Sequence, residues 1–363
     1  MRRAVVVKLG SSTLVDARGR PRRALLHALA GEIAELGAQD VPVCVVSSGA
    51  IALGAAALGR GRPVDVPGLQ AASAVGQGLL LGAWQRALRG AGLPTGQVLL
   101  TASDIHARTS YLNARATLET MLGWGVVPVV NENDSTATDE ITFGDNDALA
   151  AQVAVLLRAR LLVLLTDQDG LYTRDPRAPG AELVREVRDH GLLAEIDVDA
   201  PSSSGLGSGG MRSKIVAAEM ASAGGVSCVI ARGGRGRVLT DAVAGRNVGT
   251  RFYPDARPAA SFKLWLRYGR PSSGRLTVDA GAKRAVEEQG ASLLAVGLRG
   301  VEGRFRAGDA VTICGPDGTP FAKGLAAADA SELRRAAGRR SSEAGLAEAV
   351  HRDYLAVHGD RNP

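Results

Sequence analysis

Short apolar runs alternate with helical patterns over residues 4–230, and this alternation constrains the fold more than any other feature. We expect strands at residues 4–9, 42–46, 98–100, 126–130, 161–165 and 226–230. We expect helices at residues 21–37, directly after Gly49, and at 69–89, 111–122, 147–157 and 211–223. Strand–helix repetition produces a mostly parallel open sheet with helices on both faces, so we predict an α/β fold. Ligands bind at the carboxyl ends of such strands.

The pattern changes at Tyr253–Ala260, a segment rich in Pro and Ala. We therefore predict a first domain at 1–253, a linker at 254–261 and a second, small β-rich domain at 262–363. Its expected strands are 262–267, 275–278, 292–296, 310–313 and 321–322, with a hairpin turn at Pro316-Asp317-Gly318.

The composition excludes several classes of protein. The chain has 363 residues, 45% of them apolar, so it can bury ordinary cores. The longest strongly apolar stretch, Leu161–Leu165, is far too short to span a membrane, and the apolar run after Arg3 stops at Lys8, too early for a signal peptide. Three distant cysteines without a CxxC pair argue against disulfides and structural zinc and fit a cytoplasmic protein. The net charge of +6 permits a polyanionic partner without requiring one.

Lysine is scarce in this chain. There are 5 lysines and 38 arginines, and Lys8 and Lys214 are the only lysines in residues 1–260. We infer that these two positions need a compact ammonium group, which a planar guanidinium cannot replace.

Both lysines lie in segments that can bind a phosphate. Lys8-Leu9-Gly10-Ser11-Ser12 ends the first strand, and its alternative interpretation is a solvated lysine. Ser204–Lys214 places four glycines before a helix whose first turn carries Lys214, and its alternative is a flexible linker. This segment matches neither the Walker A pattern nor a dinucleotide fingerprint.

Three other strand ends are polar. Ser47-Ser48-Gly49-Ala50 forms an anion pocket or a plain helix cap. Amide and carboxylate side chains gather in Asn131–Asp134 and Phe143–Asp147, and a small zwitterionic ligand needs both kinds of group. One alternative is that Asp145 or Asn146 caps the next helix. A calcium loop is another alternative, but the spacing of its ligands is absent. Thr166–Tyr172 suits the base and ribose of a nucleotide, or is a simple turn.

These segments together indicate phosphoryl transfer to a small polar acceptor. We find no Ser–His–Asp candidate, and a carboxylate acceptor explains why. A glutamate-like carboxyl group, with a pKa of about 4.3, is already ionised at pH 7 and needs no general base. Two ammonium groups and Mg²⁺ can balance the charge on the transferred group.

Six segments, in order, resemble the bacterial glutamate 5-kinases of the amino acid kinase family: VVVKLGSS, VSSGAIALG, VVNENDST, FGDNDALAA, LLTDQDGLYTRDPR and SGLGSGGMRSK. GRLTVDAGAKRAV, SLLAVGLRGVEGRFRAGDAV and VHRDYL resemble a PUA domain. The resemblance implies the amino acid kinase fold followed by a PUA domain. It also implies ATP- and Mg²⁺-dependent phosphorylation of the γ-carboxylate of L-glutamate, the first step of proline biosynthesis.

The resemblance also assigns residues. It implies that Lys8, Lys214 and Asp147 are catalytic and that Ser48, Asp134 and Asn146 bind glutamate. It implies ATP binding by Lys8, Thr166, Asp167, Ser208, Gly209, Gly210, Met211, Arg212, Ser213 and Lys214, and it leaves protein ligands of the metal unassigned.

The family further implies a homo-oligomer and feedback inhibition by proline. Ser213 stands where the family often has Thr, which keeps the hydroxyl. Gly324–Ala328 lacks the Asn-Tyr of the PUA pattern, so RNA binding is not expected. A second hypothesis is an RNA-binding or regulatory protein with a relic kinase half, but the intact Lys8, Lys214 and GDND segment argue against it.

Overall fold

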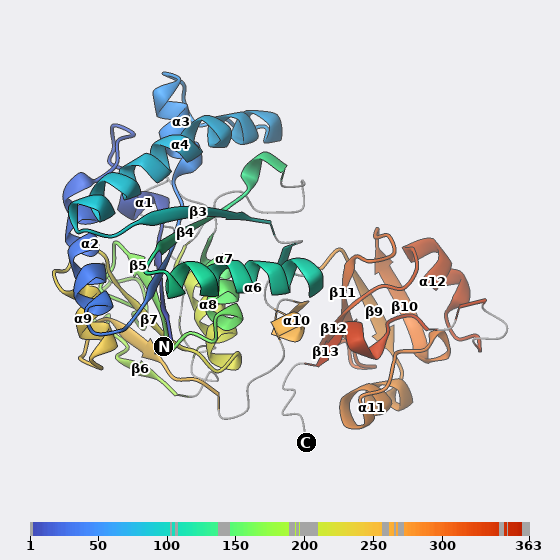
Figure 1. The fold of residues 1–363 in the computed structure, drawn as a ribbon. Helices are drawn as coiled ribbons and strands as arrows, with labels where there is room; N and C mark the ends of the chain where they lie inside the picture. The colour runs from blue at the N-terminus through green and yellow to red at the C-terminus, as the bar shows by residue number, and fades with distance from the viewer. Residues whose placement is uncertain are drawn as a thin grey trace. The chain divides into compact units, whose positions relative to one another are not determined.

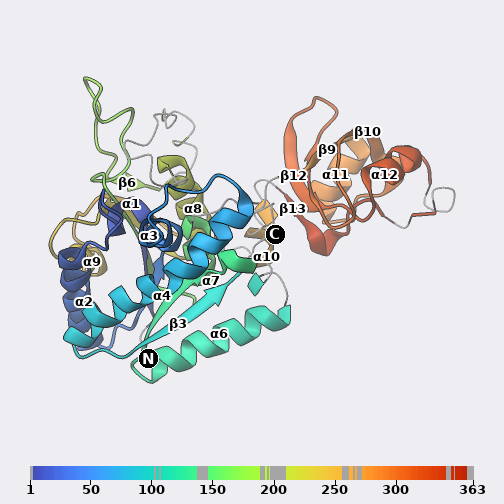
Figure 2. The same cartoon turned by 90° about the horizontal axis from the view of Figure 1, so that it is seen from above.

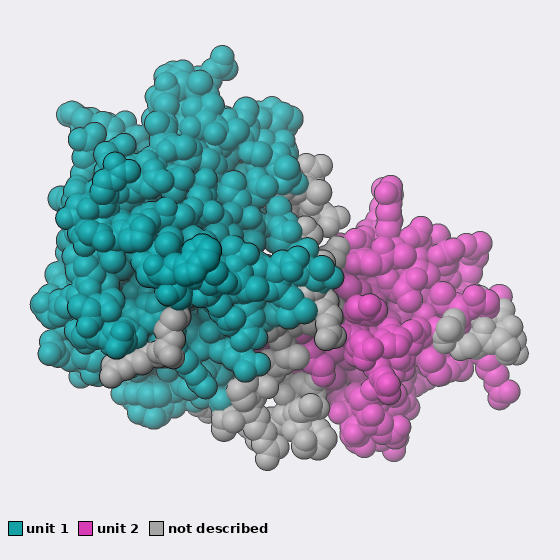
Figure 3. Space-filling model, viewed as in Figure 1, with its two compact units in different colours: residues 1–258 teal, residues 259–363 magenta. Residues whose placement is uncertain are grey.

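A computed structural model describes residues 3–101, 104–105, 108–136, 146–188, 193, 196, 210–255, 261–264, 266–267, 272–340, 345–346 and 348–357. The chain divides into two compact units, Met1–Pro258 and Ala259–Pro363, which are coloured separately in Figure 3. The described helices include none that is long and apolar enough to cross a membrane.

The first unit is built on a sheet of eight described strands, most of them parallel (Figure 1). The strand order is β3-β4-β2-β1-β5-β7-β8-β6. The parallel strands β1–β5 and β7 are Val5–Leu9, Val43–Ser47, Thr95–Leu100, Val127–Glu132, Leu161–Thr166 and Ser227–Arg232. At one edge, β8 (Thr250–Phe252) runs antiparallel to β7, and β6 (Glu186–Val187) pairs with β8.

The central strands are buried on both faces. Every residue of β1 and β5 is buried, which is typical of a parallel sheet covered by helices on either side. The α/β prediction is therefore confirmed, and the expected strand and helix positions differ from the observed ones mainly at their ends. Lys8 pairs in register with Val46 and Leu164, which places it near the carboxyl end of the sheet's interior.

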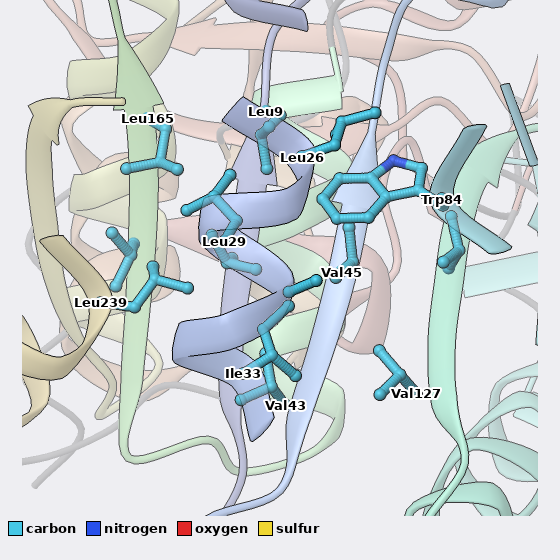
Figure 4. Close-up of a cluster of buried hydrophobic side chains, with 14 of the residues drawn as sticks. Leu9, Leu26, Leu29, Ile33, Val43, Val45, Trp84, Val127, Leu165 and Leu239 are labelled. Atoms are coloured by element: carbon cyan, nitrogen blue, oxygen red, sulfur yellow. The ribbon is translucent and has the colours of Figure 1, made fainter. Parts of the chain in front are cut away.

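Three helices cover one face of this sheet: α2 (Arg23–Gly37), α4 (Val66–Gly90) and α9 (Val238–Val243). Leu29 and Ile33 of α2 and Trp84 of α4 pack against alternate strand residues such as Leu9 and Val45 (Figure 4). Side chains alternate along a strand, so Val6 and Lys8 point away from this core. There α7 (Asn146–Leu156) packs on β1 and on α8 (Met211–Ala223).

Helices α3 (Ala50–Ala57) and α4 lie side by side (Figures 1 and 2). The contact depends on two glycines. A Cβ atom added at Gly54 would lie 1.8 Å from the carbonyl oxygen of Ala72, and one at Gly76 would lie 1.8 Å from that of Ala50. The backbones of α3 and α4 therefore approach so closely that only glycine fits at positions 54 and 76. The remaining described elements of this unit are α1 (Ser11–Leu14), α6 (Arg108–Gly123) and η1 (Asp134–Thr136).

The second unit contains a five-stranded sheet in the order β10-β9-β11-β12-β13. Strands β9–β13 are Gly274–Val278, Leu298–Gly303, Ala310–Cys314, Pro320–Leu325 and Leu355–Val357. The turn at Pro316–Gly318 joins the antiparallel β11 and β12, as predicted. The described helical segments are α10 (Ser261–Leu264), α11 (Ala280–Gln289), η4 (Ala295–Gly297), α12 (Ala330–Ala336) and η5 (Arg352–Tyr354).

Two expected strands of this unit are wrong. Residues 261–264 form α10, because a run as short as 262–267 does not separate strand from helix by periodicity. In 292–296, Leu293 makes a single bridge to Val350 and Ala295 begins η4. Leu293 and Ala295 are buried while Leu294 and Val296 are exposed, but no regular ladder forms.

All three cysteines are buried free thiols in sheet strands. Cys44 lies in β2 and Cys228 in β7 of the first unit, and Cys314 lies in β11 of the second. Burial raises the pKa of Cys44 to about 12.

Candidate active site

Lys8 and Lys214 meet at one carboxylate. The Nζ atom of Lys8 lies 2.5 Å from Oδ1 of Asp147, and that of Lys214 lies 3.1 Å from Oδ2. All three side chains are almost completely buried, and Asp147 is 0% exposed. The structure therefore brings the two scarce lysines together at one carboxylate.

Three elements deliver these groups. Lys8 lies near the end of β1, Asp147 is the second residue of α7, and Lys214 is in the first turn of α8. The Oγ atom of Ser213 lies 2.8 Å from Oδ2 of Asp147 and 2.9 Å from the carbonyl oxygen of Gly210. Gly210 is the N-cap residue of α8, and among the described residues no side-chain hydrogen bond caps this end. The amino end of a helix carries partial positive charge, which attracts anions.

The protonation of Asp147 follows from opposing effects. Burial raises its pKa, but the charges of Lys8 and Lys214 and the hydrogen bonds from Lys8 and Ser213 outweigh burial, and the pKa lies well below its usual value. One negative charge therefore faces two positive ones, and the cluster attracts a further anion.

A second group of polar side chains lines a small pocket next to this cluster. The pocket contains Ser48, Asp134 and Asn146, and its other walls include Ser11, Gly49, Ala50, Arg62 and Asn131. Asn146 directly precedes Asp147, so the two sites are adjacent. The Nδ2 atom of Asn146 donates to the carbonyl oxygen of Ser47 at 2.9 Å and to Oδ1 of Asn131.

Three polar atoms of this pocket have no hydrogen-bond partner among the described residues. They are Oγ of Ser48, Oδ1 of Asp134 and Oδ1 of Asn146. Buried polar atoms are normally paired, so their convergence indicates a polar ligand. The helix cap that was the alternative interpretation of this segment is Gly49, with φ of +109°, and neither described serine of the segment caps α3 through its side chain.

Helix α4 contacts the carboxylate of Asp134. The Oγ atom of Ser73 donates to Oδ2 of Asp134 at 2.5 Å. Burial raises the pKa of Asp134, while the hydrogen bond from Ser73 and the charge of Arg62 oppose that shift.

Thr166 and Asp167 line a separate open pocket of about 830 Å³ at the carboxyl ends of β1, β5 and β7. The Oγ1 atom of Thr166 lies 3.1 Å from Oδ1 of Asp167. The other polar residues that line this pocket include Ser12, Thr13, Arg22, Arg23 and Arg232. The size and the mixed polar lining suit a nucleotide-sized ligand.

Comparison with known proteins settles the family. Residues 3–232 match the model of the amino acid kinase family. The chain belongs to the amino acid kinase family. Residues 274–344 match the PUA domain.

This amino acid kinase is similar along nearly its whole length to proteins named glutamate 5-kinase. It is 47% identical to the one from Myxococcus xanthus, over 98% of this chain and 96% of that protein. It is 45% identical to the one from Streptomyces coelicolor, with the same coverage. It is 43% identical to one from a Synechococcus species, over 97% and 98%. Its fold also matches carbamate kinase from Giardia lamblia bound to AMP-PNP, with a TM-score of 0.50 at 20% identity over 70% of this chain and 99% of that one.

The other predicted site residues of this amino acid kinase fall in the glycine-rich segment. Met211 and Arg212 lie in the first turn of α8, where Arg212 is exposed. Ser208 and Gly209 lie outside the described residues. Sequence reasoning missed Arg62 and Ser73. Arg62 carries no motif signal, and Ser73 lies in a helix of small residues, where a hydroxyl attracts no notice.

The family implies Mg²⁺, and the described residues fit a loosely held ion. Both oxygens of Asp147 already contact ammonium groups. Within the described ranges, no group of three or more His, Cys, Asp or Glu side chains is arranged to hold a metal ion. Mg²⁺ commonly keeps several waters and binds through substrate phosphates, which suits a site of this kind.

Proposed function

We propose that this amino acid kinase transfers the γ-phosphoryl group of ATP to the γ-carboxylate of L-glutamate. The product is γ-glutamyl phosphate, and the reaction is the first step of proline biosynthesis. The observation that carries this proposal is the cluster of Lys8, Asp147 and Lys214 beside a pocket whose polar atoms have no hydrogen-bond partner among the described residues. The glutamate 5-kinases that match the full chain support the choice of substrate.

The lysines supply charge. Lys8 and Lys214 stabilise the negative charge that spreads over the transferred phosphoryl group, and Asp147 fixes where the two ammonium groups point. No side chain has to remove a proton, because the acceptor carboxylate of glutamate is ionised at neutral pH. Catalysis is then a matter of positioning and electrostatics.

The adjacent pocket orients glutamate. Oδ1 of Asp134 accepts a hydrogen bond from the α-ammonium group, and Ser48 and Asn146 bind the remaining polar groups of glutamate. The carboxylate of Asp134 binds a charged ammonium group more strongly than the neutral amide of N-acetylglutamate.

Thr166 and Asp167, with residues Ser208–Lys214, bind ATP at the strand ends and at the start of α8. Bound Mg²⁺ neutralises phosphate charge and is held largely by the phosphates. The nucleotide analogue bound to the Giardia carbamate kinase supports a nucleotide site in this fold.

The test is hydroxamate formation from glutamate with ATP, Mg²⁺ and hydroxylamine. We expect hydroxamate from L-glutamate and little from aspartate or N-acetylglutamate, and little release of ADP when UMP is the acceptor. Turnover of one of those three with none on glutamate would overturn the substrate assignment.

We also propose domain boundaries at 1–253 and 262–363 with a linker between them, a cytoplasmic homo-oligomer, and feedback inhibition by proline. The second domain is a structural or regulatory appendage rather than an RNA reader. Titration of the full chain with RNA at two salt concentrations tests this, because phosphate contacts produce a steep salt dependence. Tight, strongly salt-dependent binding would favour a role in RNA binding.

A further inference from the structure

We infer that Ser73 is a positioning residue that fixes the carboxylate of Asp134 so that one of its oxygens is reserved for the ammonium group of the substrate. This inference rests on the proposed function. It concerns a residue of helix α4 that lies in none of the segments predicted to bind a ligand.

The contact is directional. Ser73 is 0% exposed, and its hydroxyl, which has a single hydrogen to donate, lies 2.5 Å from Oδ2 of Asp134. Oδ1 of the same carboxylate has no hydrogen-bond partner among the described residues, and Asp134 lines the pocket. The two oxygens therefore have different roles, one satisfied by the protein and one left for a ligand.

Helix α4 holds the Asp134 segment at two points one turn apart. Ser73 contacts the side chain of Asp134, and Nε2 of Gln77 donates to the backbone carbonyl oxygen of Glu132 at 3.1 Å. The close backbone contact at Gly54 and Gly76 fixes α4 against α3, which begins at the pocket. Ser73 thus approaches Asp134 from a rigid support.

Ser73 also helps to keep Asp134 charged. A buried carboxylate tends to take up a proton, and a hydrogen bond to its charged form opposes that tendency. Arg62, from the segment between α3 and α4, adds a positive charge near Asp134. The two α4 residues that hydrogen-bond to residues 132–134, Ser73 and Gln77, are neutral. Glu132, two positions before Asp134 in β4, is the neighbouring acid in the sequence.

The test uses the full chain with Ser73→Ala and compares L-glutamate with glutarate, which lacks the ammonium group. We expect the KM for glutamate to rise about tenfold, as loss of a hydrogen bond to a charged group predicts. The inhibition constant of glutarate and the KM for ATP should stay within about twofold of wild type, because neither depends on Oδ1 of Asp134. The acid limb of kcat/KM for glutamate should move to higher pH.

Ser222→Ala is the matched control, since Ser222 is also a buried helical serine with 0% exposure. It should leave all four quantities unchanged. If Ser73→Ala fails to fold, Ser73→Cys keeps a weak donor of similar size and should shift the glutamate KM in the same direction. Equal changes for glutamate and glutarate, or no change in either, would overturn the inference. A wild-type protein inactive on glutamate would instead overturn the proposed function.

Discussion

The ammonium nitrogen of Lys8 lies 2.5 Å from Oδ1 of Asp147, deep inside the protein and between the sheet and helix α7. Because Lys214 contacts the other oxygen of Asp147 at 3.1 Å, a single carboxylate fixes the separation of two positive charges.

Replacing Lys214 with arginine should lower kcat by about 100-fold or more, the loss typical when one donor to a transition-state charge is displaced. The guanidinium is wider and planar, so it cannot occupy the same buried point beside Asp147. Steady-state kinetics with saturating glutamate and ATP measure the effect. Lys283→Arg, in the second unit, is the control and should retain wild-type kcat. Near wild-type turnover in Lys214→Arg would show that a compact ammonium is not required.

Replacing Asp147 with asparagine should destabilise the first unit by about 3–5 kcal/mol, because two buried ammonium groups lose their counter-charge. Urea unfolding followed by tryptophan fluorescence reports this, since Trp84 is buried in the core of that unit. The exposed Asp353→Asn serves as control and should unfold like wild type. An unchanged midpoint for Asp147→Asn would mean that the lysines do not need the carboxylate for stability.

The stability difference between wild type and Asp147→Asn should depend on pH in one direction. The folded-state pKa of Asp147 is lowered, so its contribution is fully present above the usual aspartate pKa of about 3.9 and declines as the pH falls below it. We expect a constant difference between pH 7 and pH 5 that narrows in more acidic solution. Unfolding curves at several pH values test this, and a difference that widened on acidification would contradict the charge assignment.

Replacing Gly54 with alanine should destabilise the protein by about 2–3 kcal/mol and raise the KM for glutamate. The added methyl group would lie 1.8 Å from the carbonyl oxygen of Ala72 and would push α4, with Ser73, away from the pocket. Thermal unfolding and glutamate titration give the two readouts. Gly78→Ala, in the facing helix α4, adds a methyl group that meets no described atom within 4 Å and should stabilise the protein by about 1 kcal/mol. A similar thermal midpoint for both variants would argue against the close contact.

Much of the first unit could be predicted from the sequence because its strands are buried on both faces. Continuous apolar runs such as Val5–Leu9 and Leu161–Thr166 have few other interpretations. Short or exposed strands carry no such signal. Strand β10, Leu298–Gly303, contains glycines and charged residues and is largely exposed, and β6 has two residues, so both were missed.

Some residues of the candidate site could also be predicted from the sequence, and others could not. The scarcity of lysine in residues 1–260 is enough to single out Lys8 and Lys214, whereas the placement of Asp147 between them follows only from the family resemblance. Ser73 could not be predicted, because its role depends on how α4 packs beside η1, and local sequence does not encode that distance.

The buried thiols have a practical consequence. Cys44 and Cys228 are sealed in one unit and Cys314 in the other, so a thiol reagent can reach each sulfur only when its own unit opens. The three cysteines can therefore report on unfolding of each unit separately. Mass spectrometry of alkylated peptides can follow this without any engineered probe.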